Sequence, residues 1–471
     1  MRTFVTENGR PHPKNLAKMT ERDRQILRIA VPAIVTNITE PLLGLVDTAI
    51  VGHMGSAVYI GAIAVGAMIF NLVYWVFGFL RMGTSGLTAQ ARGRRDVAET
   101  AGLLRRSLVL AMTVAAVMLV LQVPLCRLMM WLIAPTTDVS SLAATYFYIV
   151  VWGAPASLGL FALSGWFIGM QNTRLPMLMS IVQNVVNIIA SLLLVYVLDM
   201  KVDGVATGTV IAQYIGMIVG LALLWRYYRR WFRRSRSACL SKKSQLTNRN
   251  VLDRKVDQSA LSSMAGFLRI NRDIFLRTLC LVAVNLYFTS AGARQGATVL
   301  AVNTLLMQLY LIFSYFMDGF AYAGEALGGR YWGARNEAAF RDVVRRIFMW
   351  CGAVTLLFTT LYVAGGMPFL RLLTDEVAVV EASQQYVWWA WLIPVAGAAA
   401  FAWDGIFIGI TLTGGMLLSS FVAAVVFFVS LWLSVPLLGN HGLWLAMILY
   451  LLTRGIMQTL LFCNRVAKPL S

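Results

Sequence analysis

The sequence predicts an all-α integral membrane protein with twelve transmembrane helices in two six-helix bundles. The composition is 59% hydrophobic with only 13% charged residues, and the mean hydropathy is +0.70, which excludes an ordinary soluble domain. Apolar segments long enough to cross the hydrocarbon core recur along all 471 residues. The two halves of the chain also carry matching segments, which indicates an internal repeat.

Each predicted span is an apolar segment that ends at a short polar or glycine-rich break. The twelve spans are 29–51, 58–80, 107–133, 142–168, 175–197, 204–225, 274–292, 297–320, 347–370, 380–407, 414–436 and 442–463. The first 28 residues are polar and basic and offer no small-residue cleavage site. We therefore expect the first span to be retained rather than removed as a signal peptide.

The positions of the basic residues explain the formal charge of +19 without a nucleic-acid partner. Of the 40 Lys and Arg residues, 33 lie on one side of the predicted spans, thirteen of them between the sixth and the seventh. Basic loops gather on the cytoplasmic side of a membrane, beside anionic lipid headgroups. We therefore expect both termini in the cytoplasm, contacts with membrane lipids, and no nucleic-acid binding.

The internal repeat has a spacing of about 240 residues. "SGWFIGMQNT" at 164–173 matches "DGIFIGITLT" at 404–413, and "LLRR" at 103–106 matches "VVRR" at 343–346. Six spans return the chain to its starting side, so the copies have the same topology, as in transporters whose site lies between parallel repeats. The expected domains are a first bundle, a basic cytoplasmic connector and a second bundle, at 1–225, 226–271 and 272–471.

Two carboxylates, Glu40 and Asp47, lie in the first span, within "EPLLGLVDTAIVGHMG". A charge at the bilayer centre costs about 2.5–3.5 kcal/mol, so such residues usually face the bundle interior and mark a pathway or a proton relay. Seven residues are nearly two helical turns, so the pair shares a face with Asn37. Pro41 removes a hydrogen bond from the Asn37 carbonyl and is expected to kink the helix.

Asp47 and Glu40 are therefore the candidate proton- or cation-coupling residues. The alternative is a structural role, in which Asp47 satisfies neighbouring hydroxyl groups or pairs with Arg81.

Further polar residues in the spans are candidates for a substrate path or a supporting polar network. Asp318 and Glu325 repeat the spacing of seven residues, and Asp404 lies in the tenth span. We expect these three acids to form a network in the second half, together with Arg81. Asn184 and Asn187 share a helix face, and they either line the path or make interhelical hydrogen bonds.

Signals for an enzyme are weak. The three histidines lie far apart, and the chain contains neither H-E-x-x-H nor a P-loop. The five cysteines are scattered without a C-x-x-C pair, so no metal site is expected. We expect no enzymatic activity, no cofactor and no direct use of ATP, which leaves an ion gradient as the energy source.

Three segments carry a family resemblance: "PLLGLVDTAIVGHMGSAVYIGAIAVG" (41–66), "FLRMGTSGLTAQARG" (79–93) and "WDGIFIGIT" (403–411). They resemble the multidrug and toxic compound extrusion (MATE) family, in particular its DinF-like branch, and the resemblance covers about residues 20–465. It implies two bundles around a V-shaped cleft and export of organic cations in exchange for protons or sodium ions. It also implies that Asp47 couples cations and that its helix bends at Pro41.

Two departures from the family pattern bear on the coupling ion. Some DinF-type members carry an aspartate four residues after a span-five asparagine, where this chain has Ser191 after Asn187. Sodium-coupled relatives carry an acid in the seventh span, where this chain has none. Protons are therefore favoured over sodium ions, with coupling at Asp47, alone or together with Glu40.

The sequence as a whole predicts a monomeric antiporter of a bacterial inner membrane that exports cationic or amphipathic small compounds. The alternative is a lipid-linked oligosaccharide flippase of the same superfamily. A carrier of pyrophosphate headgroups should present buried arginines, whereas this chain has five candidate acids in its spans against three basic residues in or near them.

Overall fold

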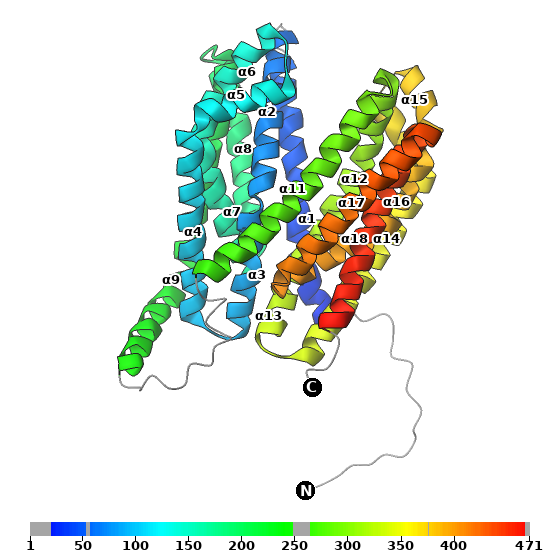
Figure 1. Cartoon of the computed structure of the whole chain (residues 1–471). Helices are drawn as coiled ribbons and strands as arrows, with labels where there is room; N and C mark the ends of the chain where they lie inside the picture. The colour runs from blue at the N-terminus through cyan, green and yellow to red at the C-terminus, as the bar shows by residue number, and fades with distance from the viewer. Residues whose placement is uncertain (1–19, 53–56, 248–263, 375, 467–471) are drawn as a thin grey trace, which may run out of the picture.

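The computed structural model describes residues 20–52, 57–247, 264–374 and 376–466. Within these residues all regular secondary structure is helical. Figure 1 shows two groups of helices that lie close together at one end and diverge toward the other. We call these the closed end and the open end. The described chain begins and finishes at the closed end, with Glu21 and Arg465 as the first and last helical residues.

The first half contains nine α-helices among its described residues. They are α1 (Glu21–Gly52), α2 (Ala57–Phe77), α3 (Phe79–Gly93), α4 (Val97–Val120), α5 (Gln122–Ile133), α6 (Thr137–Val150), α7 (Ala154–Gly169), α8 (Arg174–Tyr196) and α9 (Lys201–Thr247), with a 3-10 turn, η1 (Val151–Gly153), before α7.

The second half repeats this plan with one π-helical turn inserted. Its elements are α11 (Met264–Ala293), α12 (Ala297–Ala323), the π-helix η2 (Gly324–Gly328), α13 (Gly329–Gly333), α14 (Glu337–Leu373), α15 (Val377–Ser383), α16 (Val387–Gly409), α17 (Thr413–Leu438) and α18 (Asn440–Arg465).

The helices agree with the predicted spans. Within the described residues, eleven helical segments are long and apolar enough to cross a membrane, and the 32-residue helix α1 covers the first predicted span. The predicted third span, 107–133, is divided at Leu121 between α4 and α5. Helix α9 continues past the sixth span to Thr247, because arginine and lysine favour helix even where polarity ends a membrane span.

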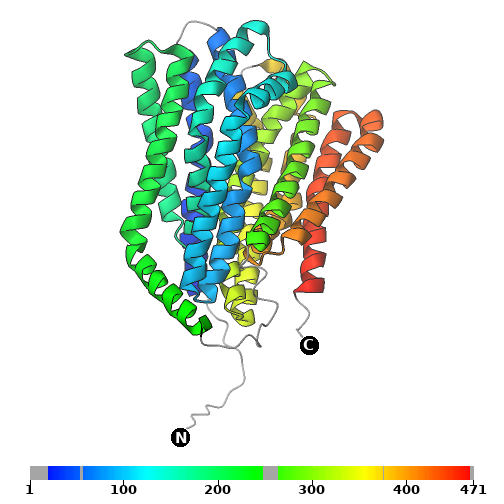
Figure 2. The same ribbon diagram turned by 60° about the vertical axis from the view of Figure 1, so that its left-hand side comes forward.

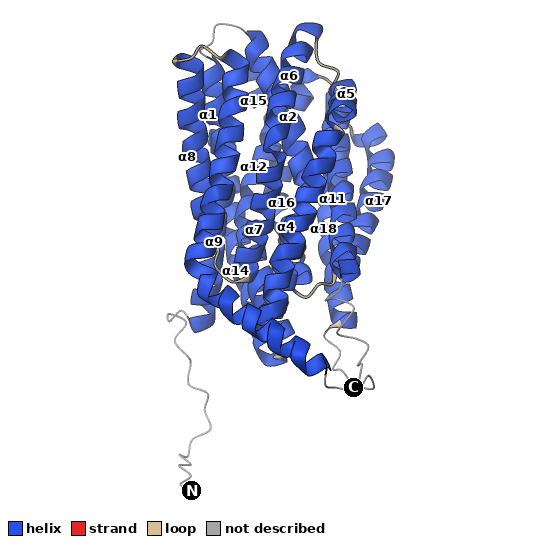
Figure 3. Ribbon diagram, turned by 90° about the vertical axis from the view of Figure 1, so that its left-hand side faces the viewer, coloured by secondary structure: helices blue, strands red, loops and turns tan. Residues whose placement is uncertain are grey.

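The extension of α9 is held against the first half by aromatic packing. Figures 2 and 3 show α9 continuing past its neighbours at the closed end and bending there. Tyr228, Trp231 and Phe232 on this extension surround the buried Trp166 of α7, with ring centroids 4.9, 5.9 and 5.9 Å away. The start of the predicted connector, from residue 226, is therefore helical and packs against α7.

The repeat in the sequence is also a repeat in backbone geometry. Residues with a positive φ recur 240 positions apart, as Arg95 and Arg335 (φ 59° and 54°), Gln171 and Thr411 (both 57°), and Asp199 and Gly439 (51° and 55°). The caps that start α4 and α14 also correspond. Asp96 accepts a hydrogen bond from the Glu99 amide at 2.9 Å, and Asn336 accepts one from the Ala339 amide at 3.0 Å.

Glycines bring equivalent helices into backbone contact in each half. A Cβ atom on Gly165 of α7 would collide with the carbonyl oxygen of Arg81 in α3, and one on Gly405 of α16 would collide with that of Ala321 in α12. Small residues permit this approach between membrane helices, whose association depends on close packing. These contacts fix the polar residues of α3 and η2 relative to their own bundles.

Helices α1 and α11 cross from one half toward the other. Helix α1 packs against α12 and α14 of the second half as well as α8 of the first. Helix α11 packs against α2 and α3 of the first half and α17 of the second, and Figure 1 shows it running diagonally between the two groups. Residues near the closed-end starts of α1 and α11 therefore lie at the seam between the halves.

We predict that Gly405→Ala destabilises the protein by about 2 kcal/mol or more, because backbone atoms of α12 have to move to admit a methyl group. Thermal unfolding of the detergent-purified protein measures this change. Gly352→Ala in α14 is the control, since nothing lies within 4 Å of its added Cβ. Equal stability of the two variants would contradict the proposed backbone contact.

Candidate functional site

A buried ion pair joins the two halves of the chain. Arg81 on α3 lies 3.4 Å from a carboxylate oxygen of Glu325 on η2, measured from Nη1 to Oε2. The Ser85 hydroxyl donates a hydrogen bond to the same oxygen, and the Arg81 guanidinium lies 4.2 Å from the ring centroid of Tyr322. Glu325 is 1% exposed, so its charge depends on these partners.

Glu325 is placed by the π-helical turn. In a π-helix the hydrogen bonds run from i to i+5, and such insertions are frequent at functional sites. Glu325 is the second residue of this turn, and its carboxylate pairs with Arg81 of the other half. Asp318 is half-buried and makes no hydrogen bond or ion pair with any described residue.

A second buried network surrounds Asp404 of α16. Its Oδ2 accepts hydrogen bonds from Arg277 of α11 and, at 2.6 Å, from Arg454 of α18. Its Oδ1 accepts one from Gln458 Nε2 at 2.7 Å. Two guanidinium groups therefore share one carboxylate, and three helices of the second half are joined at one buried point.

Hydrogen bonds and ion pairs divide the expected network of Arg81 with the three acids into two parts. Arg81 pairs with Glu325, and Asp404 pairs within the second half, whereas Asp318 forms no ion pair with any described residue. Helices α3 and η2 approach each other across the seam, but Asp404 faces α11 and α18. Sequence reasoning assigned no role to Arg277, Arg454 or Gln458, although arginines in apolar segments signal buried carboxylate partners.

A cavity of about 110 Å³ lies beside the Arg81–Glu325 pair. Its wall combines residues of α1, α3, α7 and α8 with one residue of α12, and its polar or aromatic members include Thr36, Asn37, Arg81, Ser164, Gln183 and Tyr322. Asn37 also donates to the Tyr315 carbonyl at 3.3 Å, which links α1 to α12. The cavity thus combines polar groups from α1, α3, α7 and α8 with an apolar wall.

The two asparagines of α8 bond to different helices. Asn184 donates to the Thr39 carbonyl of α1 at 3.1 Å, and Asn187 donates to the Thr209 hydroxyl of α9 at 3.1 Å. Both make the interhelical hydrogen bonds that were one of the two predicted roles. Asn37, rather than this pair, lines the cavity.

Glu40, Pro41 and Asp47 lie on α1, directly after the segment that lines the cavity. The backbone of α1 is helical through these positions, whereas their side chains lie outside the described residues. Their roles in coupling and in bending therefore stay predictions.

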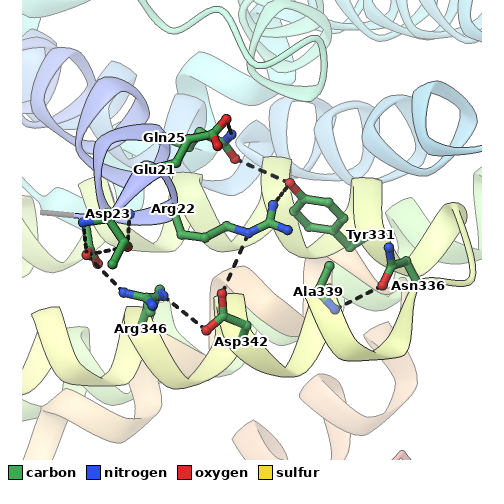
Figure 4. A network of polar contacts seen from close by, with 10 residues as sticks. Glu21, Arg22, Asp23, Gln25, Tyr331, Asn336, Ala339, Asp342 and Arg346 are labelled. Atoms are coloured by element: carbon green, nitrogen blue, oxygen red, sulfur yellow. Dashed lines mark hydrogen bonds and ion pairs between the residues drawn. The ribbon is translucent and has the colours of Figure 1, made fainter. Parts of the chain in front are cut away.

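A third polar group, which we call the closed-end network, connects α1 with α13 and α14 (Figure 4). It consists of Arg22, Asp23, Tyr331, Asp342 and Arg346. Arg346 donates to Asp23 at 2.9 Å and to Asp342 at 3.1 Å, and Arg22 lies 3.6 Å from Asp342 and also contacts Tyr331. This network ties the start of α1 to the second half.

Asp23 stays ionised in this network. It lies in the first turn of α1, ahead of the span predicted from residue 29. Burial alone would raise the pKa of Asp23, but hydrogen bonds from Thr20, Trp350 and Arg346 outweigh burial and hold the pKa below its ordinary value. The carboxylate is thus charged throughout the physiological pH range.

Two bundles that repeat each other in parallel, with paired charges buried between and within them, are the architecture of a membrane transporter of the parallel-repeat class. The chain belongs to the MatE family, whose model matches residues 32–193 and again 274–434. It is therefore a multi-pass membrane transporter for small molecules and not an enzyme.

Particular relatives agree with this assignment. The chain is 36% identical to DNA damage-inducible protein F of Escherichia coli (strain K12), over 94% of this chain and 92% of the relative. It is 22% identical to the probable multidrug resistance protein NorM of Thermotoga maritima, over 95% and 93%. The fold matches the Vibrio cholerae MATE transporter VcmN in its bent form, with a TM-score of 0.78, 17% identity and 94% and 96% of the two chains covered.

We predict that Asp404→Asn destabilises the protein by about 3–5 kcal/mol, because it leaves two buried guanidinium groups without a counter-charge. Thermal unfolding in detergent tests this expectation. Glu381→Gln, at an exposed position of α15, is the matched control and should change little. A stability loss no larger than that of the control would show that the buried arginines do not need the Asp404 charge.

We predict that Asp23→Asn lowers the unfolding temperature by the same amount at pH 5 and pH 8. A carboxylate with a lowered folded-state pKa contributes stability above its unfolded pKa, and that contribution is lost only as the pH falls through the lower, folded value. Unfolding curves of both proteins at pH 5, 6, 7 and 8 measure the difference. A difference that disappears near pH 6 would show that Asp23 titrates in the physiological range.

Proposed function

We propose that this protein is a proton-coupled antiporter that exports cationic or amphipathic small compounds across a bacterial inner membrane by alternating access. The observation that carries the proposal is the buried Arg81–Glu325 pair between the halves, beside a cavity of about 110 Å³. Opening the closed end separates this pair and leaves two unpaired charges in the interior. This costs free energy, and the cost is lower if the carboxylate takes up a proton. Proton uptake and the conformational change are then linked.

The closed end faces the cytoplasm in this proposal, with both termini on that side. The clusters of basic residues that follow α3 and α13 lie at this end. The structure then corresponds to a state closed toward the cytoplasm, in which a substrate leaves from the open end. The protein acts as a monomer in this scheme, since each chain supplies both bundles.

In this scheme the carboxylates of Asp47 and Glu40 on α1 bind either a proton or the cationic substrate. An ionised carboxylate attracts a cationic compound, and a proton arriving from the outer side removes that attraction and favours release. The family resemblance supports Asp47 for this role, and α1 supports it through its position, because the same helix lines the cavity and crosses to the second half.

Protons are favoured over sodium ions by the chemistry of the second half. Metal cations need several free oxygen ligands. Both oxygens of Asp404 already accept hydrogen bonds from Arg277, Arg454 and Gln458. A cation at this carboxylate would have to displace two guanidinium groups.

The same pairing argues against an oligosaccharide-lipid flippase. A pyrophosphate headgroup needs cationic side chains that are available to bind it. Arg81, Arg277 and Arg454 each pair with a carboxylate inside the protein. The relatives named above as a multidrug resistance protein and a MATE transporter also favour the exporter.

We predict that purified protein in liposomes moves protons when an organic cation is added under an imposed pH gradient, and that Asp47→Asn abolishes this flux. Glu325→Gln should uncouple the flux as well, because a permanently neutral side chain no longer requires a proton to part from Arg81. A pH-sensitive dye inside the vesicles reports the flux for each cation of a panel. Asp203→Asn, an exposed substitution at the start of α9, is the control.

Three results would contradict this proposal. Undiminished flux in Asp47→Asn would move coupling to another residue. Flux that needs sodium rather than a pH gradient would replace the coupling ion. Absence of flux in the wild-type protein under both gradients would exclude cation-coupled export of the compounds used.

A further inference from the structure

A groove of about 510 Å³ lies at the seam between α11 and the first half, near the closed end. Its residues include Phe79, Leu110, Leu268, Arg269, Arg272 and Phe275. Phe79 of α3 and Phe275 of α11 meet edge to face across the seam, with ring centroids 5.8 Å apart. The groove therefore has an apolar wall from both halves and two cations from α11 alone.

The groove has an excess of positive charge. Arg269 makes no hydrogen bond or ion pair with any described residue, and its side chain is exposed. Arg272 donates to Asp273 at 2.9 Å, while the other oxygen of Asp273 accepts a hydrogen bond from Thr413 at 3.2 Å. Only Arg272 of the two arginines has a carboxylate partner, so the pair of arginines retains a net charge of about +1 for an outside anion to neutralise.

The equivalent place in the second half is closed by a side chain of the protein. There α1 brings Asp23 onto α14, where Arg346 and Trp350 donate hydrogen bonds to it. The internal repeat aligns Arg346 with Arg106 and Trp350 with Leu110.

At the groove, the described residues form no counterpart of this contact. Arg106 already pairs with Glu99 of its own helix at 3.0 Å, and the small Leu110 leaves the space that Trp350 fills in the other half. Helix α11 places Arg269 and Arg272 in the wall of the groove together with Leu110. Where α1 meets the second half, residues of the protein itself fill the contact. Where α11 meets the first half, two arginine side chains lie beside an apolar wall.

We propose that this groove binds an anionic glycerophospholipid, with its phosphate on Arg269 and Arg272 and its glycerol and upper acyl chains against Phe79, Leu110 and Phe275. Guanidinium groups bind phosphate through paired hydrogen bonds, and basic pockets between membrane helices on the cytoplasmic side bind lipid headgroups. The groove of about 510 Å³ is large enough for the headgroup, the glycerol and the upper acyl chains but not for the whole lipid. Exposed Leu268, Leu276 and Leu279 continue the apolar surface along α11.

The bound lipid contacts both halves of the protein. Phe79 and Leu110 belong to the first half and Arg269, Arg272 and Phe275 to the second. A ligand that bridges the seam stabilises the arrangement in which the groove exists, so anionic lipid favours the state closed toward the cytoplasm. This inference rests on the proposed orientation, which places the groove in the cytoplasmic leaflet.

The test measures lipid binding to the full-length purified protein. Delipidated protein in detergent is titrated with phosphatidylglycerol or phosphatidylcholine, and the unfolding temperature and the lipid adducts in native mass spectra are recorded. Phosphatidylglycerol is expected to raise the unfolding temperature of the wild-type protein more than phosphatidylcholine does. The double variant Arg269→Gln/Arg272→Gln is expected to bind it about tenfold or more weakly, as loss of charged hydrogen bonds predicts.

Two further variants distinguish lipid binding in the groove from a general effect of the protein's positive charge. Arg294→Gln/Arg371→Gln removes two exposed arginines at the open end and should retain the phosphatidylglycerol effect. Leu110→Trp places an indole where the second half has Trp350, and it should displace the lipid without any change of charge.

Equal binding by the wild type and by both groove variants would overturn the proposal, and so would a wild type that does not distinguish the two lipids. A shift reproduced by inorganic phosphate at the same concentration would make the groove a phosphate site instead. Since no transport is measured, a failure of this test leaves the antiport proposal standing, and a failed flux assay leaves this one standing.

Discussion

A charged group inside a membrane protein must be paired, and the structure of this chain follows from how its buried charges meet that requirement. Arg81 has its partner Glu325 in the other half of the molecule, so the pair exists only while the halves are together. Asp404 has both arginine partners in its own half and holds α11, α16 and α18 together. One pair can therefore respond to separation of the halves, while the other keeps the second bundle rigid.

Close glycine contacts fix the charged residues to rigid helices. Because Gly165 lies against the backbone of α3 at Arg81, the arginine cannot shift without α7. Gly409 likewise lies against the carbonyl oxygens of Gly324 and Glu325, which fixes the π-helical turn to α16. Separation of the halves then moves whole helices and acts directly on the ion pair between them.

The internal repeat gives the molecule two similar crossings, yet their chemistry differs. At one crossing Asp23 binds Arg346, and the low pKa of Asp23 makes this contact insensitive to physiological pH. At the other, Arg269 and Arg272 face an apolar groove. Because the Asp23–Arg346 contact does not titrate in the physiological range, the proposed proton coupling depends on interior carboxylates such as Asp47 and Glu325.

Much of this architecture was determined by the sequence alone, because hydrocarbon imposes a strict length and polarity on every span. The twelve spans, the repeat and the membership of the MatE family all rest on such local patterns. The importance of Arg81 and Glu325 was also visible, since charges within apolar segments are rare.

Only the tertiary structure decided which charges meet. Asp318 and Glu325 share a spacing of seven residues, but only Glu325, on the π-helical turn, forms an ion pair with Arg81 among the described residues. Arg277, Arg454 and Asp404 lie in three separate spans, and no local pattern brings them together. Pairing across helices depends on how whole helices pack, and this packing is set by glycine contacts and crossing geometry that the order of residues does not state.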